Sequence, residues 1–194
     1  AFVITISAKQ VGGIRNAART HQPYLQGFRG VLLATEICVM VTGFTYLGLV
    51  ESLAIFSSYT LIVAAMSGPI LGEIVGWRRW MAIFAGLCGV LIILKPGMGV
   101  FSVYAIIPLI AASMFALYSL LTRYVARQDS TATSFFWTGV TGCIVMTFVG
   151  MFHLEDMIPA DWLLMLCLCF TGATGHWLLI RCYEVAEASA VQPF

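Results

Sequence analysis

Long apolar stretches, separated at short intervals by polar segments, dominate this chain. A helix needs about 20 mostly apolar residues to cross the hydrocarbon core of a bilayer. The stretches have this length, and they predict an all-α polytopic membrane protein. A shorter stub at residues 1–8 resembles the end of one more span. The expected complete spans are residues 31–50, 53–72, 79–95, 101–122, 132–152 and 160–180.

Positive charge falls on alternate polar segments. Apart from Lys95, every Lys and Arg lies in the first, third, fifth or seventh segment, and Arg29 is counted with the first. Cytoplasmic loops retain Lys and Arg, whereas translocated loops do not. The odd-numbered segments are therefore expected to face the cytoplasm. The even-numbered segments carry Glu51, Glu155, Asp156 and Asp161.

A pair of adjacent arginines is expected to anchor one span at the cytoplasmic interface. Arg78 and Arg79 lie at the start of the stretch 79–95, and Trp77 and Trp80 flank them. Aromatic and cationic side chains gather where a span meets the polar headgroups. We therefore predict that these two arginines are cytoplasmic anchors.

Small residues recur at helical spacing in two neighbouring stretches. Gly68, Gly72 and Gly76 are four residues apart, and Gly86 gives the next stretch a similar groove. In lipid, small residues allow two helices to approach closely. The pattern predicts tight packing of these two helices. A sliding surface for a moving helix is the alternative, and Pro69 inside the ridge is consistent with it.

Glu36 and His176 are the ionisable residues that stand out within the spans. Each lies near the expected cytoplasmic end of its stretch, 31–50 for Glu36 and 160–180 for His176. A charged group at such depth is costly unless it faces protein or water. Two interpretations fit this pattern. In the first, the two residues line a polar cavity as a protonatable pair. In the second, Glu36 snorkels to the interface and His176 is a hydrogen-bonded packing residue.

Polar side chains on several spans suggest a cavity for a mainly uncharged or mixed organic solute. Thr42 and Tyr46 share one side of the stretch 31–50, Ser57 lies in a polar cluster of the next stretch, and Tyr118 belongs to another. Ser and Thr also bond to their own helix backbone, so each residue alone is weak evidence. The candidate substrate-pathway residues are Glu36, Thr42, Tyr46, Ser57, Tyr118 and His176.

Motifs for catalysis and for metal or nucleotide binding are absent from the sequence. It contains no GxGxxG, no Walker A run, no HExxH and no CxxC. We therefore expect no catalytic residues, no metal site and no cofactor. The expected partners are a small-molecule substrate and the lipid bilayer, with no nucleic acid. The rival classes are a membrane-embedded enzyme and a non-transporting membrane scaffold or assembly factor.

One long stretch resembles the half-domain core of the drug/metabolite transporter superfamily, EamA type. Residues 46–97 read YLGLVESLAIFSSYTLIVAAMSGPILGEIVGWRRWMAIFAGLCGVLIILKPG, and the last residues read CYEVAEASAVQPF. The features that carry the resemblance in residues 46–97 are Leu71-Gly72-Glu73, Arg78-Arg79-Trp80 and Lys95-Pro96-Gly97. The last residues resemble the same region in the second half of a family member. Aligning the chain with itself at a shift of 136 residues pairs Glu51 with Glu187, and Ala54 with Ala190.

This resemblance implies a bundle of ten helices in two inverted five-helix halves. Residues 1–97 would form the first half, from the end of helix two to helix five. Residues 98–194 would form the second, from helix six to the start of helix nine. The chain would then be an internal piece of a longer protein, and Glu73, the acid of the family motif, would have a structural role.

The resemblance and the residues together predict a secondary transporter. We expect it to move a small organic metabolite across the bacterial inner membrane by alternating access, at the interface between inverted repeats. We do not expect an enzyme. The scaffold alternative predicts polar residues that face lipid or a partner instead of a common cavity.

Overall fold

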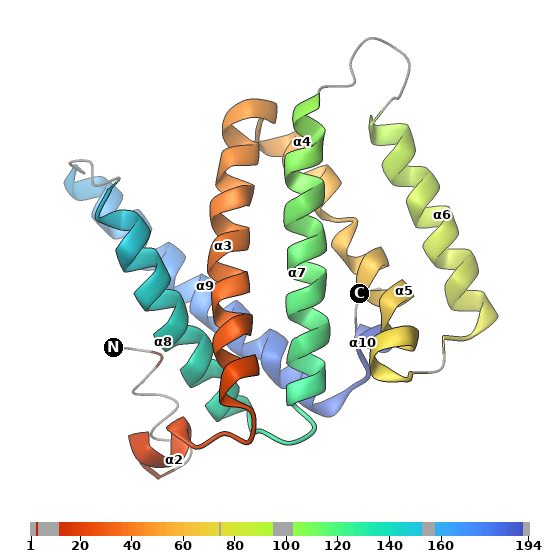
Figure 1. The fold of residues 1–194 in the computed structure, drawn as a ribbon. Coiled ribbons are helices and arrows are strands. Elements are labelled where there is room, and N and C mark those ends of the chain that lie inside the picture. The colour runs from red at the N-terminus through yellow and green to blue at the C-terminus, as the bar shows by residue number, and fades with distance from the viewer. Residues whose placement is uncertain (1–2, 4–11, 74, 95–102, 153–157, 192–194) are drawn as a thin grey trace. The chain divides into compact units, whose positions relative to one another are not determined.

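Every regular element in the described part of the chain is a helix (Figure 1). The computed structural model describes residues 3, 12–73, 75–94, 103–152 and 158–191. The predicted stub at 1–8 and the Lys95-Pro96-Gly97 turn lie outside these residues, apart from Val3. The elements are α2 (Ile14–Ala18), α3 (Pro23–Leu47), α4 (Leu49–Phe56), α5 (Tyr59–Leu71), α6 (Trp77–Leu94), η1 (Val103–Ala105), α7 (Ile106–Val125), α8 (Thr131–Gly150), α9 (Pro159–Val185) and α10 (Ala188–Val191).

Five helical segments in the described residues are long and apolar enough to cross a membrane. The prediction of an all-helical chain with membrane-spanning helices is therefore confirmed for this part of the chain. Helix α6 forms where the span 79–95 is predicted, and its crossing of the membrane stays a prediction. The five segments are Pro23–Leu47, Leu49–Leu71, Val103–Val125, Thr131–Gly150 and Pro159–Val185.

Several predicted boundaries differ from the structure. Helix α3 begins at Pro23 instead of residue 31, because proline suits the first turn of a helix, where its missing N–H is not needed. Helix α9 continues past residue 180 to Val185. The predicted span 53–72 begins earlier and is interrupted at Ser57 and Ser58, so that it consists of α4 and α5.

The chain forms two compact units. Unit 1 comprises residues 1–31 and 125–185, and unit 2 comprises residues 32–124 and 186–194. The expected division into sequence halves, 1–97 and 98–194, concerns an internal repeat and stays a prediction.

In unit 1, helix α8 packs against α9 and α2. The start of α3 also approaches α8 closely at Gly30. A Cβ atom added to Gly30 would lie 2.6 Å from Cβ of Thr141, which is closer than packed atoms come. A glycine at this position therefore allows the two backbones to pack side by side.

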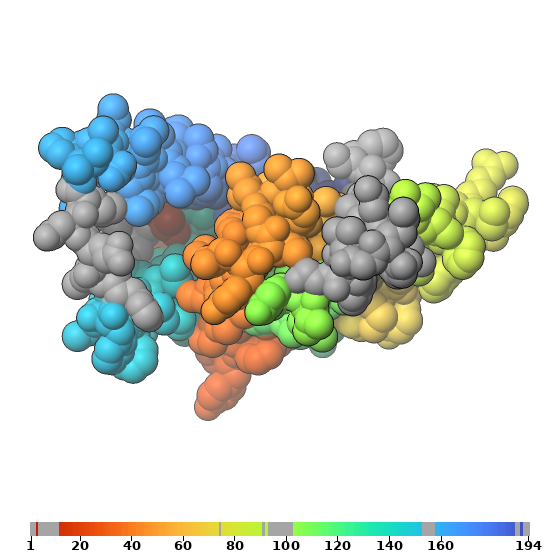
Figure 2. Space-filling view, turned by 90° about the horizontal axis from the view of Figure 1, so that it is seen from above, coloured from red at the N-terminus to blue at the C-terminus, as the bar shows by residue number. Residues whose placement is uncertain are grey.

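In unit 2, α5 contacts α6 and α10, and the later part of α3 contacts the start of α7. At the contact of α3 with α7, the Cβ position of Gly43 is 3.5 Å from Cδ of Pro108. The end of α3 (orange) borders the start of α7 (green) in the space-filling view (Figure 2). Helices α3 and α7 and the turn between α4 and α5 carry most of the predicted pathway residues, and these residues belong to unit 2.

Candidate transport site

A short 3₁₀ turn interrupts the span Leu49–Leu71 between α4 and α5. Here the backbone changes to i→i+3 hydrogen bonds: the N–H of Ser58 donates to the carbonyl of Ile55, and the N–H of Leu61 donates to that of Ser58, each at 3.0 Å. The Ser57 hydroxyl donates to the carbonyl of Ala54 at 2.7 Å. A 3₁₀ stretch within a helix often marks a functional hinge. The predicted pathway residue Ser57 lies in this turn.

Four aromatic rings meet at this turn, and we call them the aromatic cluster. Phe56 and Tyr59 lie on either side of the turn, with ring centroids 5.1 Å apart. The ring of Phe115, from α7, is 5.5 Å from Phe56 and stands edge-on to Tyr59 at 4.7 Å. Tyr118 follows at 5.7 Å from Phe115. The predicted pathway residue Tyr118 is fully buried, and it lies beside the interrupted span.

Buried hydroxyl groups accompany the aromatic cluster on the same elements. The hydroxyls of Ser52, Ser58 and Ser119 are buried, and none has a hydrogen-bond partner among the described residues. The Thr122 hydroxyl, also buried, donates to the carbonyl of Tyr118 at 2.7 Å. Burying a hydroxyl without a partner costs about 1–3 kcal/mol. Buried hydroxyl groups without partners are therefore unusual in a region that only packs helices together.

Two further predicted pathway residues lie on α3 in the same unit. Thr42 donates its hydroxyl to the carbonyl of Cys38 at 2.9 Å, within its own helix. Tyr46 stacks on Tyr104 with the ring centroids 5.0 Å apart and the planes 13° from parallel. Tyr46 is 58% exposed and Tyr104 is 49% exposed. This stacked pair joins the end of α3 to η1 and leaves part of its surface open.

Glu36 and His176 belong to different units. Glu36 lies on the part of α3 in unit 2 and is buried. His176 lies on α9 in unit 1. The predicted pairing of Glu36 with His176 stays a prediction.

Arg29 does not lie in a loop, and its interpretation as a loop charge is wrong. It lies within α3, is fully buried, and donates from Nη2 to the carbonyl of Ser134 at 2.8 Å and to the Thr138 hydroxyl at 2.9 Å. The sequence did contain a signal. Pro23 marks a helix start, and Gln26 and Arg29 are three residues apart on one side of that helix.

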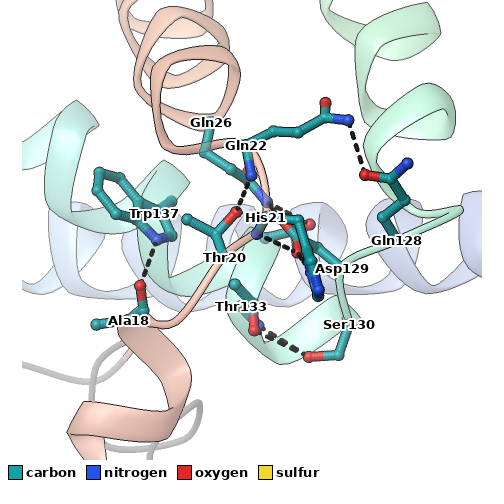
Figure 3. A network of polar contacts seen from close by, with 11 residues as sticks. Ala18, Thr20, His21, Gln22, Gln26, Gln128, Asp129, Ser130, Thr133 and Trp137 are labelled. Carbon is teal, nitrogen blue, oxygen red and sulfur yellow. Dashed lines mark hydrogen bonds and ion pairs between the residues drawn. The ribbon is translucent and has the colours of Figure 1, made fainter.

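A polar network around Asp129 joins two chain segments of unit 1 outside the spans (Figure 3). The Asp129 carboxylate accepts hydrogen bonds from the Thr20 hydroxyl, the His21 backbone N–H and the Gln26 side-chain amide. Burial alone would raise the pKa of Asp129, but these hydrogen bonds outweigh it and hold the pKa below its ordinary value. The network is not predictable from the sequence, since no motif links residues so far apart.

A second polar cluster, the Glu73 strap, joins three helix ends in unit 2. Gly72 ends α5 with a left-handed φ of 70°, and the next residue is Glu73. The Glu73 carboxylate lies 3.5 Å from Nε of Arg123 at the end of α7 and accepts the Ala188 backbone N–H at 3.1 Å. The structural role that the resemblance implies for Glu73 fits this position and stays a prediction.

The predicted packing and anchor residues occupy varied positions. Gly68 lies within α5, whereas Gly72 caps that helix and Gly76 precedes α6, so the three do not form one helical ridge. Gly86 packs closely on α5, because an added Cβ would lie 2.7 Å from a methyl group of Leu61. The anchor residues Arg78 and Arg79 lie in the first turn of α6.

The chain is similar to bacterial proteins that are named as transporters. It is 28% identical over 203 residues to a riboflavin transporter of Vibrio cholerae, a match that covers 100% of this chain and 66% of that protein. It is 28% identical over 185 residues to a riboflavin transporter of Rhizobium johnstonii, covering 92% and 59%. It is also 22% identical over 180 residues to an S-adenosylmethionine uptake transporter of Rickettsia prowazekii, covering 93% and 61%.

The comparisons and the helices point to a multi-pass membrane protein related to transporters rather than to enzymes. No family model and no solved structure matches the chain. The chain spans 59% to 66% of the length of these three relatives.

Proposed function

We propose that this chain is part of a secondary transporter that moves a small organic metabolite across the bacterial inner membrane. The observation that carries the proposal is the interrupted span at Ser57 and Ser58. Secondary transporters commonly build their substrate sites from discontinuous helices near the middle of the membrane. The interruption, the aromatic cluster and the buried hydroxyls of unit 2 support a site of this kind.

The proposed architecture is the ten-helix bundle of two inverted halves that the drug/metabolite transporter resemblance implies. Residues 1–97 would belong to the first half and residues 98–194 to the second. Inverted repeats support alternating access because one half can rock against the other around a fixed site. The alternation of positive charge along the chain supports this assignment, since the spans 31–50 and 160–180 then cross in opposite directions.

The proposed pathway residues are Glu36, Thr42, Tyr46, Ser57, Tyr118 and His176. Among them, Glu36 and His176 are the proposed protonatable groups. The burial of Glu36 within a span supports a role in taking up and releasing a proton.

The named relatives suggest which substrates to test first. Riboflavin and S-adenosylmethionine both combine a flat nitrogen heterocycle with a polar chain. A site that offers aromatic rings and hydroxyl groups suits both parts of such a molecule. We propose a metabolite of this kind as the substrate.

Uptake into proteoliposomes tests the proposed function. The complete protein would be reconstituted, and entry of radiolabelled riboflavin and of S-adenosylmethionine measured against protein-free liposomes. We expect saturable uptake of at least one compound. Comparative metabolomics of cells with and without the complete gene would widen the search to other metabolites. If no metabolite shifts in cells and neither compound enters the liposomes, the transporter proposal fails and the scaffold alternative gains support.

A further inference from the structure

Three rings of the aromatic cluster are partly exposed as well as packed. Phe56, Tyr59 and Phe115 are each only half-buried, whereas Tyr118 behind them is fully buried. The rings come from both sides of the 3₁₀ turn and from α7, so three backbone segments position them. Partly open rings held by rigid helices offer faces and edges on which another flat ring can pack.

Two serines next to ring-bearing residues in the sequence have buried hydroxyl groups. Ser58 directly precedes Tyr59, and Ser119 directly follows Tyr118. Both hydroxyls are buried without a hydrogen-bond partner in the described part of the chain. Helix packing alone favours apolar groups here, because an unpaired hydroxyl away from water is unfavourable. A ligand with donor or acceptor atoms on the edge of its ring would supply the missing partners.

We propose that the aromatic cluster at the 3₁₀ turn binds a flat heteroaromatic ring of the transported molecule. This inference rests on the proposed function and deepens it by naming the part of the substrate that is recognised and the residues that recognise it. The ring stacks against or stands edge-on to Phe56, Tyr59 and Phe115. Its polar edge atoms bond to the hydroxyls of Ser58 and Ser119, and the polar chain of the substrate is not needed for this contact.

Binding of lumichrome to the complete protein in lipid nanodiscs tests the inference. Lumichrome is a fluorescent, flat, three-ring heterocycle without a sugar chain, so its fluorescence reports ring binding alone. We expect saturable binding that adenine, another flat heterocycle, reduces by competition. Ribitol, a polar chain without a ring, should not displace lumichrome. Absence of saturable lumichrome binding, or displacement by ribitol, overturns the inference.

Matched variants locate the binding to the cluster. Phe115→Leu keeps an apolar side chain but removes the ring, and we expect lumichrome affinity to fall about five-fold or more, as for the loss of one stacking partner. Phe115→Tyr keeps the ring and should retain affinity. The control is Phe148→Leu in unit 1, where an exposed ring packs edge-on against Phe152 at 5.4 Å. Equal losses in Phe115→Leu and Phe148→Leu would overturn the assignment.

A second variant covers the case in which Phe115→Leu does not fold. Phe56→Leu removes a ring from the other side of the cluster, and a circular dichroism spectrum checks each variant before titration. We expect the same direction of change. Uptake in the liposome assay without lumichrome binding leaves the proposed function standing and removes this inference. Lumichrome binding without uptake of any tested metabolite leaves the cluster as a ring-binding site, but it contradicts the proposed function and the part of the inference that links the ring to transport.

Discussion

Asp129 is the residue that ties the segment before α3 to the segment before α8. Its carboxylate is 2% exposed, whereas the His21 ring beside it is 76% exposed. Hydrogen bonds from Thr20, His21 and Gln26 favour the ionised form, so the pKa in the folded protein lies below that of the unfolded chain. The stabilisation is therefore present above the ordinary Asp pKa of about 4 and is lost as the pH falls through the lower, folded value.

Asp129→Asn is expected to lower the stability at pH 7 by about 1–3 kcal/mol, since buried donors lose a charged acceptor. The difference from the unsubstituted protein should shrink as the pH falls below about 4. Thermal unfolding in detergent micelles at several pH values measures both effects. Asp161→Asn, at an exposed position in the first turn of α9, is the control and should cost less. A cost at pH 7 no larger than that of the control would contradict the prediction.

Single residues were the hardest feature to predict from the sequence. Thr42, Tyr46, Ser57 and Tyr118 could be selected because polar groups are rare in apolar stretches, and all four lie in unit 2. Arg29 was misjudged because its charge suggested a loop, whereas neutral oxygens from α8 accept its hydrogen bonds inside the protein. Such a partner lies more than 100 residues away in the chain, and local patterns carry no information about it.

At the scale of helices, the Glu73 strap holds the ends of α5, α7 and the start of α10 together. The Glu73 and Arg123 side chains are 5% and 18% exposed. The neighbouring pair of Arg79 with Glu187 is 38% and 54% exposed, with its charged atoms 3.9 Å apart. Exposed ion pairs contribute little because water screens them, whereas partly buried pairs are screened less.

A double-mutant cycle with Glu73→Gln and Arg123→Gln should give a coupling free energy of at least about 1 kcal/mol. The matched cycle with Arg79→Gln and Glu187→Gln should give about 0.5 kcal/mol or less. Both cycles use the midpoint of thermal unfolding in the same detergent. Equal coupling free energies in the two cycles would show that burial of the Glu73 strap does not strengthen its ion pair.

The spans were predictable because a hydropathy signal summed over about 20 residues is strong. The end of α5 was not predictable, because the spacing of Gly68, Gly72 and Gly76 fits a helical ridge as well as it fits the end of a helix. The structure uses Gly72 in the left-handed region to stop the helix, which glycine does without steric cost. The turn at Ser57 and Ser58 escaped notice for a similar reason, since serine is tolerated within helices.

At the scale of the whole molecule, transport and its pH dependence test the proposed role of Glu36 and His176. Glu36→Gln and His176→Gln remove the two titratable groups while keeping side chains of similar size. We expect uptake to lose its dependence on pH in the double variant, and the rate to fall several-fold. Uptake into proteoliposomes between pH 5.5 and 8 measures both. Unchanged uptake and an unchanged pH profile would contradict the proposal that Glu36 and His176 act as a protonatable pair.

The 3₁₀ turn at Ser57 and Ser58 also sets the register of α4 relative to α5. A 3₁₀ residue advances the chain by about 120° and 2.0 Å, and an α-helical residue by about 100° and 1.5 Å. Conversion of these two residues to α-helix would turn α4 about its axis by about 40° relative to α5 and shorten the span by about 1 Å. Phe56 and Tyr59 lie on opposite sides of the 3₁₀ turn. The same small backbone change would therefore alter the angle between their rings.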